Sequence, residues 1–112
     1  MEVYKPDTNN VGYKIVKIDL SEKFQLNDTI LVQIKKGKFG LTVQFLHEDK
    51  IFFLGMRGIL FSCMKILNCQ YLESYVGKRL NIKGTLVNYG KRSKNGVTFY
   101  DIRFYPTSTS ST

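Results

Sequence analysis

Basic and aromatic side chains alternate along one segment of the chain, residues 78 to 105, in a pattern that suits binding of a polyanion. Seven of its residues are basic and one is acidic: Lys78, Arg79, Lys83, Lys91, Arg92, Lys94 and Arg103 against Asp101. Five are aromatic: Tyr89, Phe99, Tyr100, Phe104 and Tyr105. Cations follow phosphates and flat rings stack on bases, so this combination is typical of single-stranded nucleic-acid binding.

The positive charge of the chain is concentrated in this segment. It carries six of the eight net charges, whereas the first 77 residues hold ten basic and eight acidic side chains. A length of 112 residues fits one domain, and an apolar fraction of 43% excludes a disordered polyelectrolyte. We expect one domain at 1–106, with an irregular arm at 1–10 and a disordered Ser/Thr tail at 107–112.

Catalytic and metal-binding patterns do not emerge from the sequence. The one histidine, His47, lies beside Glu48 and Asp49 in a predicted turn, where a solvated imidazole is far more common than a general base. Cys63 and Cys69 are six residues apart in a predicted helix, so their side chains point in different directions and a disulfide between them is not expected. Their spacing also matches no zinc-binding pattern. We therefore expect no enzyme activity, no metal and no cofactor.

The thiols and the N-terminal residues favour a cytoplasmic location, which would be the host cytoplasm for a viral protein. Free cysteines indicate reducing conditions. The first ten residues are polar, unlike a signal peptide, and no apolar run reaches the length of a membrane span.

The elements that must position the basic segment are mostly strands. Alternating and β-branched patterns predict strands at 12–20, 29–36, 41–47, 51–54, 79–89 and 97–105. Residues 29–36 alternate cleanly, so we expect one buried face and one wet face. Tight turns at 37–40 and 48–50 would join three of these strands into a meander.

One helix is expected between the two groups of strands. Apolar residues recur at three- and four-residue steps, at Leu60, Cys63, Met64, Leu67 and Tyr71, over about four turns. Ser62 is the expected N-cap, and Gly77 has the place of a left-handed terminating residue. A basic loop at 90–96 then joins the last two strands, with Asn95-Gly96 as the turn signal.

This element order is that of an OB-fold, a five-stranded Greek-key barrel with a helix between strands 3 and 4, and the fold class is all-β with one helix. One parity of the last two strands should face inward, namely Leu80, Ile82, Leu86, Tyr100, Ile102 and Phe104. Gly84 would let its strand bend at the barrel corner. Either 12–20 or 29–36 would be the first barrel strand.

The second half of the chain resembles bacterial and phage single-stranded-DNA-binding proteins. Residues 51–55 (IFFLG), the helix and residues 77–86 (GKRLNIKGTL) match that family's Gly-ended strand, helix and G-x-x-[apolar]-x-[apolar]-x-G-x-[apolar] strand. The similarity covers residues 50–105. It implies single-stranded-DNA binding with little sequence specificity in DNA replication or recombination, a dimer or tetramer, and replication or recombination proteins as partners.

Two departures from that family shape the expectation. The chain has no tryptophan, so stacking falls to tyrosine and phenylalanine. Bacterial members recruit partner proteins through an acidic C-terminal tip. The tail of this chain lacks such a tip, and a compact phage version of the family would lack it too.

The candidate nucleic-acid-binding residues lie on the outward parity of the last two strands, at their turn and in an earlier basic patch. They are Lys83, Tyr89, Lys91, Arg92, Lys94, Phe99, Arg103 and Tyr105, with Lys36, Lys38 and Phe39 as a rim. Strand aromatics are more often core, and hairpin lysines are more often a solvated tip. Two alternatives stay open: an RNA-binding OB module, and a basic protein-interaction or inhibitor domain that meets an acidic partner.

Overall fold

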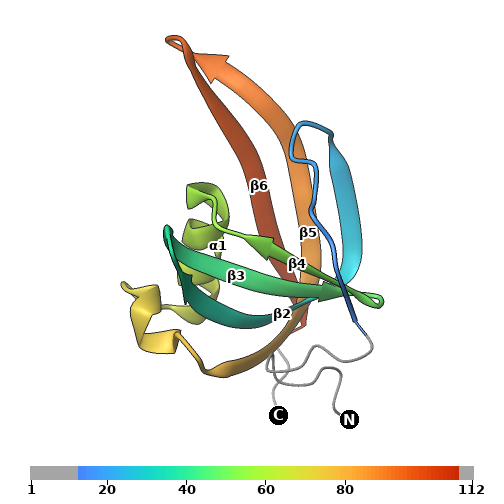
Figure 1. Cartoon of the computed structure of the whole chain (residues 1–112), viewed down its shortest axis with the longest axis vertical. Coiled ribbons are helices and arrows are strands. Elements are labelled where there is room, and N and C mark those ends of the chain that lie inside the picture. The colour runs from blue at the N-terminus through green and yellow to red at the C-terminus, as the bar shows by residue number, and fades with distance from the viewer. Residues whose placement is uncertain (1–12, 109–112) are drawn as a thin grey trace.

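Among residues 13–108, six strands form one curved sheet, with a single α-helix beside it (Figure 1). The structure is a computed structural model that describes residues 13–108. The elements are β1 (Lys14–Ile15), β2 (Phe24–Gly37), β3 (Gly40–His47), β4 (Lys50–Leu54), α1 (Arg57–Leu67), the 3-10 helix η1 (Leu72–Tyr75), β5 (Arg79–Lys94) and β6 (Val97–Ser108). The expected fold class, all-β with one helix, is confirmed.

The long strand β2 holds the sheet together. It pairs antiparallel with β3 on one side and with β5 on the other, within the strand order β1-β4-β3-β2-β5-β6. The strands β2, β3 and β4 form the expected meander, and β5 and β6 form a hairpin. Within residues 13–108 no ladder joins β6 to β1 or to β4, so the sheet is open between its edge strands β1 and β6.

The prediction that β2 has one wet face is wrong. Leu31, Val32, Gln33 and Ile34 are all buried in succession. A register shift between Leu31 and Gln33 places an extra residue in the strand. As a result Leu31 and Ile34 join the main core, while Val32 packs with Leu46 and Ile51 in a second cluster.

The strand predicted at 12–20 is also largely wrong. Of its described residues only Lys14 and Ile15 form a strand, the short β1, which pairs in parallel with β4. The side chain of Asn88 donates hydrogen bonds to the carbonyl oxygens of Leu20 and Glu22, at 2.9 and 2.6 Å. Side-chain hydrogen bonds from Asn88, and not strand pairing, therefore hold the segment that precedes β2.

The helix begins earlier and ends sooner than its apolar spacing suggests. Its N-cap is Met56, without a side-chain hydrogen bond, and Ser62 lies inside the helix, where its hydroxyl bonds the Gly58 carbonyl at 3.3 Å. Asn68, with φ of 51°, terminates α1, and Tyr71 lies beyond the end of the helix. Gly77 is left-handed, at φ of 84°, yet it precedes β5 instead of ending the helix. No helix among the described residues is long and apolar enough to cross a membrane.

The β5–β6 hairpin is longer than predicted and extends beyond the rest of the sheet (Figure 1). Asn95 and Gly96 form its two-residue turn, with φ of 53° and 76°, as their sequence indicates. The expected loop at 90–96 is wrong, because residues 90–94 continue β5 and Lys94 pairs with Val97. The strand β6 likewise reaches Ser108, two residues into the predicted tail; residues 1–12 and 109–112 lie outside the described part.

The inward parity of the hairpin is confirmed by the core. Leu86, Ile102 and Phe104 are buried, and the rings of Phe104 and Phe45 lie 5.1 Å apart between centroids. The other inward candidates, Leu80, Ile82 and Tyr100, are partly buried.

Gly84 of β5 lies directly against the β6 backbone. A Cβ on this residue would overlap the Tyr105 carbonyl oxygen and lie 2.7 Å from Cζ of Phe104. Only glycine fits this position without displacing the partner strand, so its role is close approach of two backbones.

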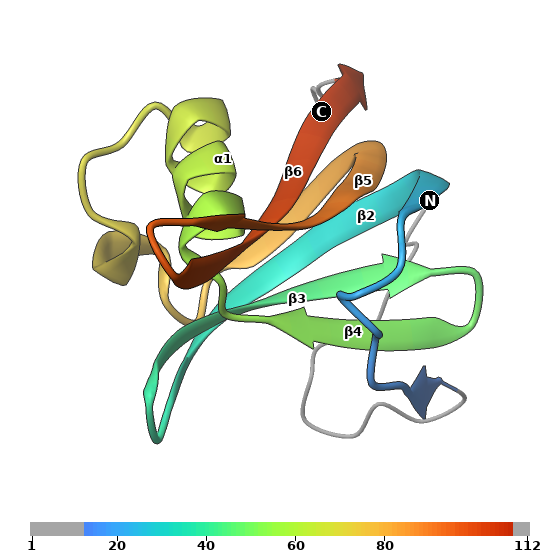
Figure 2. The same cartoon turned by 90° about the horizontal axis from the view of Figure 1, so that it is seen from above.

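The helix α1 stands beside β6, and the two elements are in contact (Figure 2). Ile59 and Cys63 are the apolar side chains that α1 buries in the core. On the other side of α1, next to β6, Phe61 and Lys65 are exposed to solvent.

Candidate nucleic-acid interface

Two tyrosines form the centre of the outward face of β5 and β6. Thr85 is paired with Tyr105 and Val87 with Arg103, so these side chains lie on one face with Tyr89. The hydroxyls of Tyr89 and Tyr105 are 3.0 Å apart, and the two residues are 49% and 46% exposed. We call the surface formed by Lys83, Tyr89, Arg103 and Tyr105, with Arg92, Lys94 and Phe99 farther along, the hairpin face.

The hydrogen bond between the two hydroxyls, followed by burial, raises the pKa of Tyr89 above its ordinary value. The phenol therefore stays neutral at physiological pH and adds no negative charge to this basic surface. A base could meet the exposed part of either ring.

The two cations beside the tyrosine pair, Arg103 and Lys83, each form a weak ion pair with a carboxylate. Nε of Arg103 lies 3.1 Å from Oδ1 of Asp101, and Nζ of Lys83 lies 3.6 Å from Oδ1 of Asp28. Ion pairs between partly exposed groups are worth about 1 kcal/mol or less, so a phosphate could replace the carboxylate at low cost.

The hairpin beyond Tyr89 divides its three cations between two faces. A second register shift lies between Asn88 and Lys91, after which Arg92 is paired with Phe99 and Lys94 with Val97. Arg92 and Lys94 therefore share the hairpin face with Phe99. Lys91 is instead paired with Tyr100, which lies on the opposite face of the hairpin together with Ile102 and Phe104.

The position of Lys91 is consistent with its electrostatics. Hydrogen bonds from Ser21 lower the pKa of the Asp19 carboxyl, and the positive charge of Lys91 adds a smaller effect in the same direction. Lys91 thus neighbours the segment before β2, and the structure separates it from the other hairpin cations.

The rim residues Lys36, Lys38 and Phe39 belong to the β2–β3 hairpin. Phe39 is 95% exposed in the turn, and Nζ of Lys38 lies 5.7 Å from its ring centroid. The tips of this hairpin and of the β5–β6 hairpin lie apart in both Figure 1 and Figure 2. The rim is therefore a separate basic and aromatic site.

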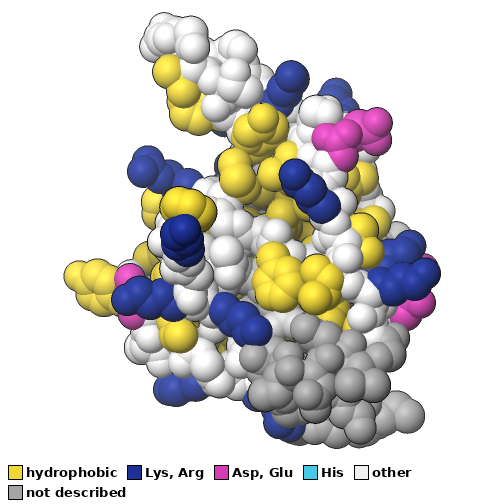
Figure 3. Space-filling view, in the orientation of Figure 1, with side chains coloured by type: hydrophobic (Ala, Val, Ile, Leu, Met, Phe, Trp, Pro, Cys, Tyr) yellow, Lys and Arg dark blue, Asp and Glu magenta, His cyan; other side chains and the backbone are white. Residues whose placement is uncertain are grey.

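Sequence reasoning missed a cation and a ring on the meander. Nζ of Lys35 lies 5.9 Å from the ring centroid of Phe53, which is paired with Gln44 on the next strand. Phe53 lies between the buried Phe52 and Leu54, so strand alternation alone could have placed it on the opposite face. On the side of the molecule seen in Figure 3, Lys and Arg are spread over the surface and acidic side chains lie at its margins.

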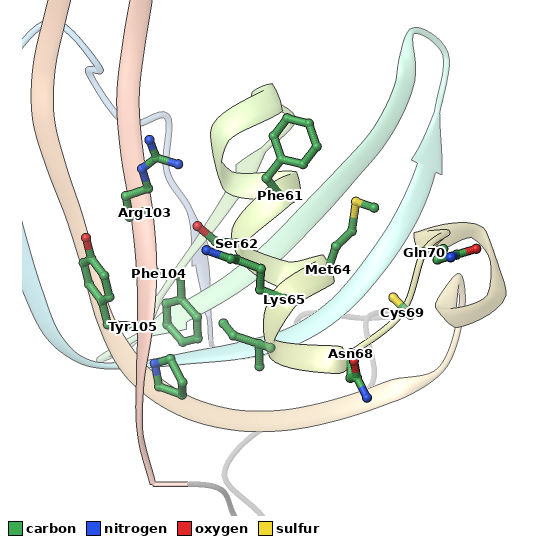
Figure 4. A pocket seen from close by; sticks show the side chains of 12 residues that line it. Phe61, Ser62, Met64, Lys65, Asn68, Cys69, Gln70, Arg103, Phe104 and Tyr105 are labelled. Atoms are coloured by element: carbon green, nitrogen blue, oxygen red, sulfur yellow. The ribbon is translucent and has the colours of Figure 1, made fainter.

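A groove of about 1010 Å³ lies between α1 and β6. Ser62 and Lys65 point from α1 toward β6, where Arg103, Phe104 and Tyr105 lie (Figure 4). A second hollow of about 320 Å³ contains Arg57, Arg92 and Phe99, and it shares Phe61 and Arg103 with the first. Neither Phe61 nor Lys65 is a candidate on sequence grounds, because the helix appears there only as scaffold.

His47 and Cys63 lie outside these surfaces. His47 ends β3, with Nδ1 3.3 Å from the Thr29 hydroxyl, so the expectation of a solvated turn histidine is wrong. Cys63 and Cys69 are free thiols, and burial raises the pKa of Cys63 to about 12. Among residues 13–108, no group of three or more His, Cys, Asp or Glu side chains could hold a metal ion.

Comparison of the chain with protein-family models, curated proteins and solved structures gives no match. The function must therefore be argued from the side chains and their arrangement.

Proposed function

We propose that this protein is an OB-fold module that binds single-stranded DNA with little sequence preference. The observation that carries the proposal is the half-exposed Tyr89–Tyr105 pair, flanked by Lys83 and Arg103 on one strand face. Rings supply stacking at about 1 to 3 kcal/mol per base, and cations follow the phosphates. Every base has a π-face, so this mode of binding tolerates any sequence.

The connectivity supports the OB-fold part of the proposal. In that fold the first barrel strand pairs with both the second and the fourth, and the helix lies between the third and fourth strands. Here β2 pairs with β3 and β5, and α1 lies between β4 and β5. On this assignment β2 is the first barrel strand and β1 is an addition at the edge.

An unpaired strand suits this surface better than a duplex. The rings of Tyr89 and Tyr105 are half-exposed, and only bases whose faces are free can stack on them. In the proposed role the protein covers exposed strands during replication or recombination.

Titration with fluorescent poly(dT) tests the proposal. We expect Tyr89→Ala to weaken binding by about fivefold or more, because one stacking contact is lost. Arg103→Ala should weaken binding and also reduce its salt dependence, because a phosphate contact is lost. Tyr71→Ala is the matched control, since Tyr71 is 70% exposed and lies outside the hairpin face.

Four outcomes would contradict the proposal. Weak affinity at low salt with no fall as salt rises would exclude the proposed binding. Unchanged affinity in both hairpin variants would place the site on another surface. Tighter binding of a matched RNA would indicate an RNA-binding module, and a stable complex with an acidic protein without oligonucleotide affinity would indicate an interaction domain.

A further inference from the structure

The groove between α1 and β6 joins directly to the hairpin face. Arg103 and Tyr105 belong to both, because they stand on the outward parity of β6 and also line the groove. Arg103 further lines the smaller hollow that contains Arg92 and Phe99. A ligand lying across Tyr89 and Tyr105 would therefore meet the groove without leaving the protein surface.

The side of α1 that lines the groove carries two exposed residues, Phe61 and Lys65, beside others that pack against the core. Phe61 is 53% exposed, whereas Ile59 and Cys63, on the other side of the helix, are fully buried. Lys65 is exposed and extends toward β6 beside Ser62 (Figure 4). The helix thus adds a ring and a cation of its own to those of the strands.

The charge of the groove favours an anionic occupant. Lys65 and Arg103 line the groove, and Arg57 and Arg92 join Arg103 in the adjoining smaller hollow, so the two hollows together draw four cations from three elements. Among the described residues Asp101 is the one acid that lines either hollow, and Arg103 already pairs with its carboxylate at 3.1 Å. A second copy of the chain is disfavoured here, since two such surfaces would repel each other.

We infer that this groove and the adjoining smaller hollow hold the continuation of the bound single strand, with a base against Phe61, which lines both, and phosphates near Lys65 and Arg57. The inference rests on the proposed function and extends the binding surface from the strands onto the helix. Arg103 would be the point at which the strand passes from one part to the other. The same lining of rings, cations and apolar side chains suits a nucleotide's base and phosphate together.

Oligothymidylates of two lengths, about 4 and about 16 nucleotides, test the extension. We expect Phe61→Ala to weaken binding of the longer strand by about fivefold or more. The shorter strand can be held by the hairpin face alone and should change less. Lys65→Gln should reduce the salt slope for the longer strand by about 0.7, the value of one phosphate contact on a single strand.

A spectroscopic reporter makes the test independent of affinity. The chain has no tryptophan, so Phe61→Trp introduces a single indole in the groove. Its fluorescence should be quenched by the longer strand. Tyr71→Trp is the control for the reporter and Lys50→Gln is the control for the lost charge, since both residues are exposed and neither lines a groove wall. Circular dichroism checks that each variant is folded.

The outcomes separate the two claims. If Tyr89→Ala weakens both strands while Phe61→Ala has no effect and Phe61→Trp is not quenched, the groove inference is wrong and the proposed function stands. If the wild-type protein binds neither strand, both fall. If Phe61→Ala abolishes binding of a polyglutamate peptide but not of DNA, the groove is a peptide site and the inference is overturned.

Discussion

The salt dependence of binding can be calculated from the two faces of the hairpin. The hairpin face presents four cations, Lys83, Arg92, Lys94 and Arg103. Each phosphate contact on a single strand contributes about −0.7 to the slope of log K against log salt. Four contacts therefore give about −2.8, so affinity should fall about 50-fold between roughly 50 and 200 mM salt.

Removing two of these cations should change the slope by a known amount. In Arg92→Gln/Lys94→Gln we expect a slope of about −1.4 and only about a sevenfold fall over the same salt range. The control is Lys14→Gln/Lys50→Gln, a register pair at the β1–β4 edge. Both double variants lower the net charge from +8 by 2, to +6, so they differ only in where the charge is lost.

Fluorescence anisotropy with a labelled short oligothymidylate gives the slopes. If the control Lys14→Gln/Lys50→Gln lowers the slope as much as the hairpin double variant does, overall charge governs binding and the position of the cations does not. An unchanged slope in Arg92→Gln/Lys94→Gln would refute the assignment of phosphates to the hairpin. Lys91→Gln should change the slope less than either hairpin substitution, because Lys91 points to the other face.

Three further outcomes follow from single sites. Gly84→Ala should destabilise the fold by about 1 to 3 kcal/mol in urea denaturation, because a Cβ would displace β6. Tyr105→Phe should return the pKa of Tyr89 toward its ordinary value in an ultraviolet titration. The raised pKa favours the neutral phenol, so the hydrogen bond between the two tyrosines stabilises the fold at neutral pH. This stabilisation is lost as the pH rises through the raised pKa of Tyr89. A thiol reagent should modify Cys69 well before Cys63, whose thiol is buried with a pKa raised to about 12.

The parity of β6 is predictable from sequence because its ladder with β5 is regular where the core is densest. Ile102 and Phe104 alternate with Arg103 and Tyr105, and period-two alternation decides which faces inward. The Asn95-Gly96 turn is predictable for a similar local reason, since both residues tolerate positive φ.

The parity of β5 beyond Asn88 is not predictable in that way. The shift there coincides with a buried amide: Asn88 donates to the Leu20 and Glu22 carbonyls and accepts a hydrogen bond from the Gly90 amide at 3.0 Å. The Leu20 and Glu22 carbonyls lie far from Asn88 in the chain, so no local pattern reveals that Lys91 turns away from Arg92. The groove was missed for the same reason, because it exists only where α1 packs beside β6.

The two-sided burial of β2 also has a consequence for the order in which the molecule opens. This strand is hydrogen-bonded to β3 and β5 and supplies Leu31 and Val32 to different apolar clusters. Its amides should therefore exchange with deuterium only when the whole domain unfolds. The tip of the β5–β6 hairpin, exposed from Lys91 to Phe99, has no such anchor and should open by itself, leaving its cations free to adapt to a strand while the sheet stays intact.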